Sequence, residues 1–189
     1  ANGLDVSSFS SVFEVNPFNR TAEVGGMTTY EDLVAATLPY GLMPLCVPQL
    51  RTITLGGAVT GLGIESASFR NGTPHESVLE MDILTGTGDV ITVSGHENDP
   101  HRDLFFTFPN SYGSLGYALR LKIELEPTKP FVHITHLRFE SAAALTVALK
   151  DLSASAMFNE SPINFLDGTV FSPTEHYLTV GTMVGALPA

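Results

Sequence analysis

The stretch best suited to hold a ligand is Thr54–Ser66, which reads TLGGAVTGLGIES. Its glycines are Gly56, Gly57, Gly61 and Gly63. Glycine lets the backbone approach a ligand closely or adopt a positive φ, where a side chain would clash. A run of such residues can also point several N–H groups at a diphosphate. The stretch is therefore the first candidate for a nucleotide-binding segment.

Two common nucleotide-binding loops do not fit this stretch. A Walker loop needs Lys after its second glycine, whereas Leu62 follows Gly61 here. A Rossmann fingerprint needs a helix after its glycines, and Ile64-Glu65-Ser66 shows no helical pattern. On spacing alone, a glycine-rich crossover loop that binds nothing explains the stretch equally well.

Other reactive side chains are better explained as structure. His133 and His136 are three residues apart on a predicted strand, so they face opposite sides and do not suit a shared metal. Glu65 either accepts a hydrogen bond from a ribose hydroxyl or a backbone N–H, or faces water. Asp82 and Asp89 flank a predicted hairpin, and we expect both to be solvated.

Charge and composition exclude several partners. Nine Lys and Arg against 20 Asp and Glu give a net charge of −11, which leaves no basic surface for nucleic acid or an anionic membrane. An anionic ligand must then be held mainly by backbone N–H groups and helix ends. The sequence contains no run of 18 apolar residues that could span a membrane, and no signal peptide is visible. The single cysteine, Cys46, excludes an internal disulfide and predicts a cytoplasmic location.

The pattern around the glycine stretch predicts an α+β fold. Residues 119–126 alternate strictly between apolar and charged side chains, as in a half-buried strand. The stretch 53–72 shows no clear periodicity. Further strands are predicted at 12–15, 21–24, 42–47, 78–84 and 90–93. One helix is predicted to start with a hydroxyl cap at Thr28-Thr29 and to end near Leu38, and a second to start with Asp99 as its cap and Pro100 as its first residue.

Pro127 and Pro130 mark the predicted domain boundary, with domains at 1–127 and 128–189. The second domain shows a β-α-β-β order, with strands at 131–139, 164–171 and 176–184 and a helix at about 141–152. This is the start of a ferredoxin-like unit, which leaves a strand edge and a sheet face uncovered. We therefore expect self-association. The residues expected to line the uncovered face are Phe131, Leu137, Phe165, Val170, Leu178 and Val180.

The order of these parts resembles the FAD-binding domain of the vanillyl-alcohol oxidase / p-cresol methylhydroxylase (PCMH) superfamily. The residues that carry the resemblance are the glycine run, the TGTGD turn at 85–89, and DLFF at 103–106 followed by GSLG at 113–116. Within that superfamily the chain is most similar to the sterol delta-24-reductase (diminuto-like) group. This closer similarity rests on GIES at 63–66, NSYG at 110–113 and the run at 165–184.

The resemblance implies an FAD-dependent oxidoreductase that transfers a hydride through the flavin to an alkene, with NAD(P)H as a possible electron donor. The substrate would be a small sterol-like or sugar-like molecule beneath a cap domain. The residues implied to contact FAD are Thr54, Leu55, Gly56, Gly57, Ala58, Thr60, Gly61, Gly63, Ile64, Glu65, Ser66 and, toward the adenine end, Tyr117.

The family's first diphosphate-binding turn would lie before Ala1, and most of the cap would lie after Ala189. The chain is thus expected to be the second half of an FAD-binding domain followed by the start of a ferredoxin-like cap. On its own it should purify with little FAD and should not turn over substrate. Two alternatives stay open: an FAD-linked oxidase of a sugar acid or alditol, and a non-catalytic module that kept the fold.

Overall fold

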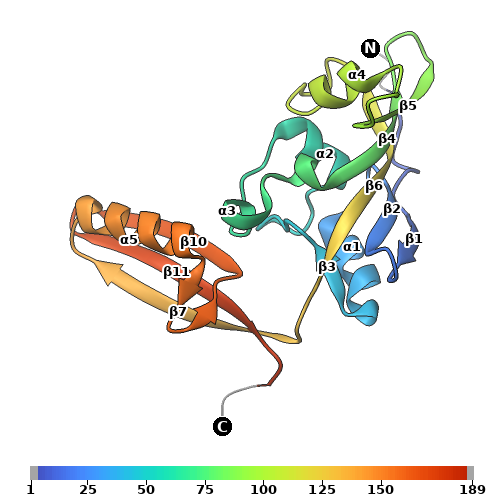
Figure 1. Cartoon of the computed structure of the whole chain (residues 1–189). Helices are drawn as coiled ribbons and strands as arrows, with labels where there is room; N and C mark the ends of the chain where they lie inside the picture. The colour runs from blue at the N-terminus through green and yellow to red at the C-terminus, as the bar shows by residue number, and fades with distance from the viewer. Residues whose placement is uncertain (1–3, 187–189) are drawn as a thin grey trace. The chain divides into compact units, whose positions relative to one another are not determined.

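The computed structural model describes residues 4–186, which form two compact units (Figure 1). Unit 1 comprises the residues up to Ile64 together with Thr73–Pro127, and unit 2 comprises Glu65–Gly72 and the residues from Thr128 on. Residues 65–72 were predicted to lie in the first domain, whereas this segment packs in unit 2. Both units mix helices and strands, which confirms the α+β class.

Unit 1 is built on an antiparallel sheet in the order β1-β2-β6-β4-β5, with β3 paired to the end of β6. Leu119, Leu121, Ile123 and Leu125 of β6 are buried while the charged residues between them are not, which confirms the predicted half-buried strand. The strands are β1 (Val12–Asn16), β2 (Thr21–Gly25), β3 (Leu42–Pro44), β4 (Val78–Leu84), β5 (Val90–Ser94) and β6 (Tyr117–Pro127).

Short helices close the core of unit 1. Helix α1 begins after Thr29, whose hydroxyl accepts the N–H of Asp32 at 3.2 Å, which confirms the hydroxyl cap predicted for this helix. The fully buried side chains include Leu33, Val59 and Phe108, each contributing about 1.5–3 kcal/mol through burial. The helical segments of this unit are α1 (Tyr30–Thr37), η1 (Leu38–Tyr40), α2 (Leu55–Gly61), η2 (Pro74–Ser77) and α4 (Arg102–Thr107).

Helix α4 begins later than predicted. Its first residue is Arg102, so Pro100 is not the first helical residue and Asp99 is not the N-cap. The Asp99 carboxylate instead accepts hydrogen bonds from the N–H and hydroxyl of Ser94, both at 2.7 Å, and from the N–H of His101. These bonds hold the pKa of Asp99 below its usual value.

Unit 2 contains a sheet in the order β10-β11-β7, packed against α5. Its elements follow the predicted strand-helix-strand-strand order, with an additional two-residue hairpin, β8–β9, after the helix. The elements are α3 (Ser68–Asn71), β7 (Phe131–Phe139), α5 (Ala142–Ser155), β8 (Met157–Phe158), β9 (Ser161–Pro162), β10 (Phe165–Ser172) and β11 (Glu175–Val184).

One face of this sheet is covered within the unit. Leu178 and Val180 are fully buried, and Val180 shares a cluster with Leu137 of β7 and Leu152 of α5. The expectation that Leu178 and Val180 need a partner was therefore wrong, because α5 packs over them. Phe131 and Val170 do remain exposed, at 40% and 62%.

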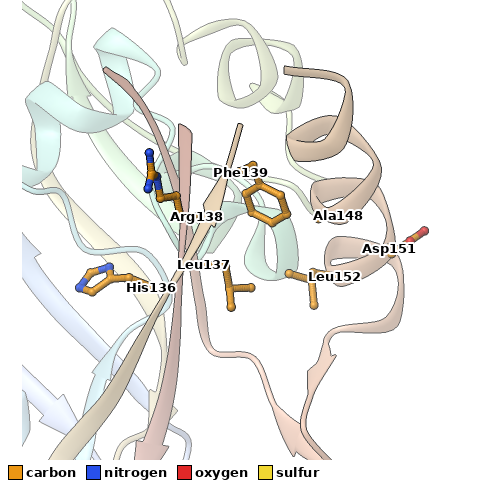
Figure 2. Close-up of a pocket in the computed structure, with 7 residues that line it drawn as sticks. All are labelled: His136, Leu137, Arg138, Phe139, Ala148, Asp151 and Leu152. Atoms are coloured by element: carbon orange, nitrogen blue, oxygen red, sulfur yellow. The ribbon is translucent and has the colours of Figure 1, made fainter. Parts of the chain in front are cut away.

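A groove of about 550 Å³ runs along the outer edge of β7 beside α5 (Figure 2). Leu137 and Phe139 point from the strand toward the helix, and Leu152 points back toward them. His136 and Arg138 lie on the other side of the strand.

Within residues 4–186, no helix is long and apolar enough to cross a membrane.

Candidate functional site

The glycine stretch begins as a helix, not as the loop that the sequence suggested. Thr54 is the N-cap of α2, and its hydroxyl accepts the N–H of Gly57 at 3.2 Å. Leu55, Ala58 and Val59 form the buried side of the helix. That spacing of i, i+3 and i+4 was present in the sequence, and the glycines between obscured it.

The first N–H groups of α2 all have partners inside the chain. Leu55 donates to the carbonyl of Thr28 at 2.9 Å, Gly56 donates to that of Gly26 at 2.8 Å, and Ala58 donates to that of Thr54. The start of α2 therefore offers no N–H to a diphosphate. The N–H groups of Gly63 and Ile64, just past the helix, have no hydrogen-bond partner among the described residues.

The glycines of α2 differ in how much space surrounds their Cα atoms. A Cβ on Gly56 would lie 2.7 Å from the Gly26 carbonyl oxygen, so this glycine is required by packing. A Cβ on Gly57 would meet only the Thr54 hydroxyl at 2.9 Å, and one on Gly61 would meet nothing within 4 Å. Neither of these two has a positive φ. The fold therefore gives no packing reason for glycine at 61, which leaves open space beside the helix, whereas a Cβ at 57 would crowd the hydroxyl that caps the helix.

The other predicted contact residues differ in what they can reach. Leu55, Gly56 and Ala58 are buried and can only position the helix, whereas Ile64 is 80% exposed. The Thr60 hydroxyl donates to the Gly56 carbonyl at 2.9 Å. Glu65 and Ser66 belong to unit 2, where the Ser66 carbonyl accepts the N–H of Leu166.

Tyr117 lines a separate pocket of about 410 Å³ in unit 1. The pocket lies between the turn that joins β4 to β5 and the loop that precedes β6, and Tyr117 itself is 48% exposed. None of residues 54–66 is among its described lining. The lining residues are Leu4, Leu84, Thr85, Gly86, Gly88, Gly113, Ser114, Gly116 and Tyr117.

The loop at 110–116, which was not among the predicted cofactor contacts, holds the end of α2. The N–H of Asn110 donates to the Val59 carbonyl at 3.3 Å, and that of Tyr112 donates to the Thr60 carbonyl at 3.1 Å. Asn110 and Tyr112 both have positive φ, and so does Leu62 at the C-cap of α2. Positive φ strains residues such as Leu and Tyr, and such strain concentrates at functional sites. Asn110 and Gly113 were the sequence signal for this turn.

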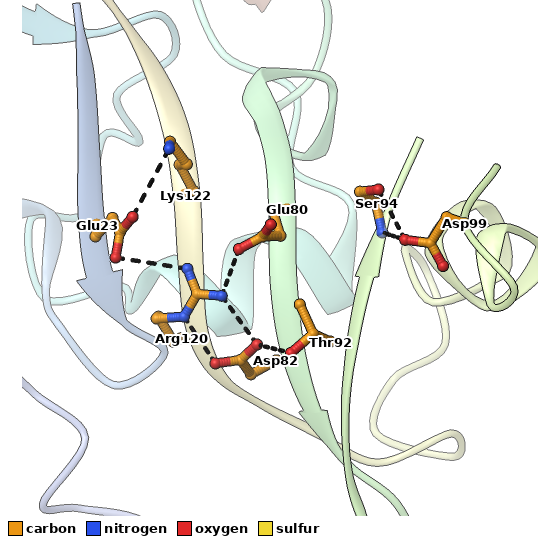
Figure 3. Close-up of polar contacts among 8 residues, drawn as sticks. All are labelled: Glu23, Glu80, Asp82, Thr92, Ser94, Asp99, Arg120 and Lys122. Atoms are coloured by element: carbon orange, nitrogen blue, oxygen red, sulfur yellow. Dashed lines mark hydrogen bonds and ion pairs between the residues drawn. The ribbon is translucent and has the colours of Figure 1, made fainter. Parts of the chain in front are cut away.

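A polar cluster on the opposite side of the sheet from the core centres on Arg120 of β6 (Figure 3). Its guanidinium donates to both oxygens of Asp82, at 2.7 and 2.9 Å, and also pairs with Glu23 and Glu80. The Thr92 hydroxyl donates to Asp82 at 2.8 Å. The expectation that Asp82 is simply solvated was therefore wrong, and the cluster ties strands β2, β4, β5 and β6 together.

Replacing Asp82 with Asn should destabilise the fold near neutral pH by about 1–2 kcal/mol, because the side chain is mostly covered and Arg120 loses a charged partner. Hydrogen bonds from Arg120 hold the pKa of Asp82 below its usual value. A depressed pKa contributes stability above the unfolded-state pKa of about 4, and this contribution is lost as the pH falls through the folded-state pKa.

Urea unfolding at neutral and acidic pH measures this effect. The gap between D82N and the unmodified chain should narrow as the pH falls below about 4. Asp89→Asn, an exposed change in the adjacent turn, is the matched control and should alter stability little. A gap of the same size at both pH values would contradict the assignment.

Among residues 4–186, no group of three or more His, Cys, Asp or Glu is placed to hold a metal ion. His133 and His136 are both exposed on β7, and His136 hydrogen-bonds through Nδ1 to the Thr179 hydroxyl at 3.0 Å. The glycine-rich surface of unit 1 is thus the strongest candidate for a ligand site.

The glycines of α2 lie within a segment that matches a known protein family. Residues 3–94 match the FAD binding domain family. The chain is 28% identical over 181 residues to the Delta(24)-sterol reductase of Arabidopsis thaliana, covering 95% of this chain and 32% of that protein. It is 32% identical over 148 residues to cytokinin dehydrogenase 7 of Oryza sativa subsp. japonica, covering 78% and 28%.

The Delta(24)-sterol reductase of Mus musculus is 27% identical over 180 residues, or 95% of this chain. The chain spans about a third of the length of these curated relatives. The resemblance noted from the sequence is confirmed. Residues 3–94 match the FAD binding domain family, and the chain is similar to Delta(24)-sterol reductases and cytokinin dehydrogenases.

Proposed function

We propose that unit 1 binds FAD along the open side of α2, and that the protein containing this chain is an FAD-dependent oxidoreductase of the sterol-reductase type. The observation that carries the proposed site is the open space at Gly61. Packing explains Gly56, and contact with the Thr54 hydroxyl bears on Gly57, but neither explains Gly61, whereas close approach of a flat ligand would.

The residue types and backbone donors of unit 1 suit a ligand such as FAD. Gly57 and Gly61 would lie against it, and the unpartnered N–H groups of Gly63 and Ile64 would donate to its anionic part. Donors of this type suit a chain with a net charge of −11, which has few cations to spare. The pocket at Tyr117 would take the adenine end. When bound, FAD supplies hydride transfer, and the protein supplies binding and orientation.

The extent of the alignments supports a reductase of sterol-like substrates. Alignments with the Delta(24)-sterol reductases cover 94–95% of this chain, and so take in most of unit 2. Those with the cytokinin dehydrogenases cover 70–81%, at slightly higher identity. NAD(P)H is the proposed electron donor, and Glu65 and Ser66 are proposed as further cofactor contacts.

The rival is a dehydrogenase of the cytokinin type, favoured by the 32% identity. Anaerobic reduction of the flavin in the whole protein that carries this chain separates the two. The reductase proposal predicts that NADPH bleaches the flavin band near about 450 nm and that a sterol with a side-chain alkene restores it. Bleaching by a cytokinin but not by NADPH would overturn the proposal in favour of the rival. A whole protein that contains no flavin would favour a non-catalytic module.

A further inference from the structure

Residues 65–72 are a segment of unit 2 that interrupts the sequence of unit 1. The chain passes from unit 1 to unit 2 after Ile64, returns at Thr73, and leaves unit 1 again after Pro127. The segment follows directly on Gly63 and Ile64, whose N–H groups have no hydrogen-bond partner among the described residues. What holds the segment therefore bears on where these two donors point.

Hydrogen bonds fix the start of the segment within unit 2. The Glu65 N–H donates to the Ser68 hydroxyl at 2.9 Å, and the Ser68 N–H donates back to the Glu65 carbonyl at 2.8 Å. The Ser66 carbonyl accepts the N–H of Leu166 in β10, also at 2.8 Å. The position of the backbone at Glu65 therefore depends on β10.

Apolar packing fixes the middle of the segment. Phe69 of α3 packs against the buried cluster of Ile163, Leu166 and Val180. Ala67, which lies between the hydrogen-bonded residues and Phe69, is only 2% exposed. Because protein interiors are close-packed, α3 is held in one position by the core of unit 2.

The other end of the link is fixed in unit 1. Leu62 is the C-cap of α2, and its N–H bonds back into that helix. The loop at 110–116 holds the last turn of the same helix. Only Gly63 and Ile64 lie between this anchor and Glu65. A link of two residues between two fixed ends has few conformations open to it, so the directions of both N–H groups depend on both anchors.

The return to unit 1 is equally short. Gly72 is the C-cap of α3, and its N–H donates to the Ser68 carbonyl at 3.0 Å. Its φ of 73° lies in the region that favours glycine and allows a sharp change of direction. Thr73 then forms a capping box with Glu76 of η2. Fixed residues of unit 1 therefore adjoin the segment on both sides.

We propose that unit 2 positions the cofactor-binding backbone of unit 1, with Phe69 and Ser68 as positioning residues for FAD. The inference rests on the proposed function, in which Gly63 and Ile64 donate to the anionic part of FAD. Phe69 and Ser68 act without touching the cofactor, because each holds the segment that sets the direction of the two N–H groups. Loss of either anchor leaves the donors in the chain but no longer pre-organised, and this weakens binding.

Flavin fluorescence titration of the full 189-residue chain measures the effect on affinity. Phe69→Ala removes the apolar anchor and should raise the Kd for FAD at least about fivefold. Ser68→Ala removes a single hydroxyl, so the chain should fold normally and its Kd should rise about two- to tenfold. Phe69→Leu keeps an apolar side chain in the cluster and should restore most of the affinity.

Two changes in unit 2 outside residues 65–72 are the matched controls. Leu178→Val shortens a fully buried side chain that is not part of the cluster around Phe69. Ser153→Ala removes a hydroxyl from α5 that bonds only within its own helix. Both variants should bind FAD as the unmodified chain does.

Amide resonances of the chain without FAD test the positioning itself. In Phe69→Ala and Ser68→Ala the amide resonances of Gly63 and Ile64 should shift. The resonance of Tyr112, in the loop that holds α2, should stay in place and show that unit 1 is intact. A role of the segment in the folding of unit 2 alone would leave all three resonances unchanged.

Two results would overturn the inference: FAD affinity unchanged in both Phe69→Ala and Ser68→Ala, or unchanged resonances of Gly63 and Ile64. Weakening by Leu178→Val as large as that by Phe69→Ala would also overturn it. An unmodified chain without saturable FAD binding would instead overturn the proposed function. The resonances would then still decide whether unit 2 positions this backbone.

Discussion

Gly26→Ala is expected to destabilise unit 1 by roughly 3 kcal/mol or more, which is large enough to unfold a marginal domain. A Cβ at this position would overlap the carbonyl oxygen of Ala118 in β6, the central strand of the sheet. Gly26 also joins that strand to α2, since its N–H donates to the Leu119 carbonyl and its carbonyl accepts the N–H of Gly56. A shift that relieved the clash would break both hydrogen bonds.

Urea unfolding followed by circular dichroism measures this change, with Gly61→Ala as the matched control. A Cβ at Gly61 meets nothing within 4 Å, and alanine favours a helix over glycine by roughly 0.5–1 kcal/mol. Gly61→Ala should therefore be as stable as the unmodified chain or slightly more so. Equal unfolding midpoints for Gly26→Ala and the unmodified chain would show that the backbone contact at Gly26 is not required.

Gly61→Val should weaken FAD binding by roughly 3 kcal/mol, about a hundredfold in affinity, while leaving the fold intact. The reason is steric. The space above Gly61 is empty in the chain itself, so a branched side chain fits there without a clash but occupies the surface proposed for the cofactor. Gly57 is a less clean position, because its Cβ would also lie 2.9 Å from the Thr54 hydroxyl that caps the helix.

The control for this variant is Val90→Ala in β5, which trims an exposed side chain of the same unit away from α2. It should bind FAD as the unmodified chain does. Unchanged FAD affinity in Gly61→Val, with the helix preserved, would show that the open glycines serve no ligand.

Much of the fold could be predicted because its signals are local. The alternation at 119–126 defines β6, and the Thr29 hydroxyl marks the start of α1. The apolar helix at 141–152 and the strands around it correspond to α5, β7, β10 and β11. In each case the apolar residues recur at the spacing that places them on the side of the element facing the core.

The errors occurred where long-range contacts override local pattern. Helix α2 was missed because glycines interrupt the few apolar residues of its buried side. Its first N–H groups also bond to a segment nearly 30 residues earlier in the chain. Asp82 looked solvated because Arg120, its partner, lies 38 residues further along the chain. The segment 65–72 joins unit 2 through Phe69, which packs beside Leu137 and Leu152. No local signal shows such a contact.

The candidate site was located from the sequence, but its mode of action was not. The glycine run suggested N–H groups or positive φ, yet Gly56, Gly57 and Gly61 have neither a positive φ nor, at the start of the helix, a free N–H. The structure offers open Cα surface instead, and only Gly63 and Ile64 as unpartnered donors among the described residues. The space around these glycines and the hydrogen bonds of their N–H groups depend on Gly26 and β6, which lie outside residues 54–66.

Binding of FAD by unit 1 can be measured by titrating the unmodified chain into FAD and following flavin fluorescence. We expect a saturable change that ADP competes away, because the proposed contacts at Gly57, Gly61 and the backbone of Gly63 and Ile64 are present in this chain. Weak binding that is lost during purification is compatible with this result. A fluorescence signal that does not saturate, or that saturates equally with Gly61→Val, would contradict the account.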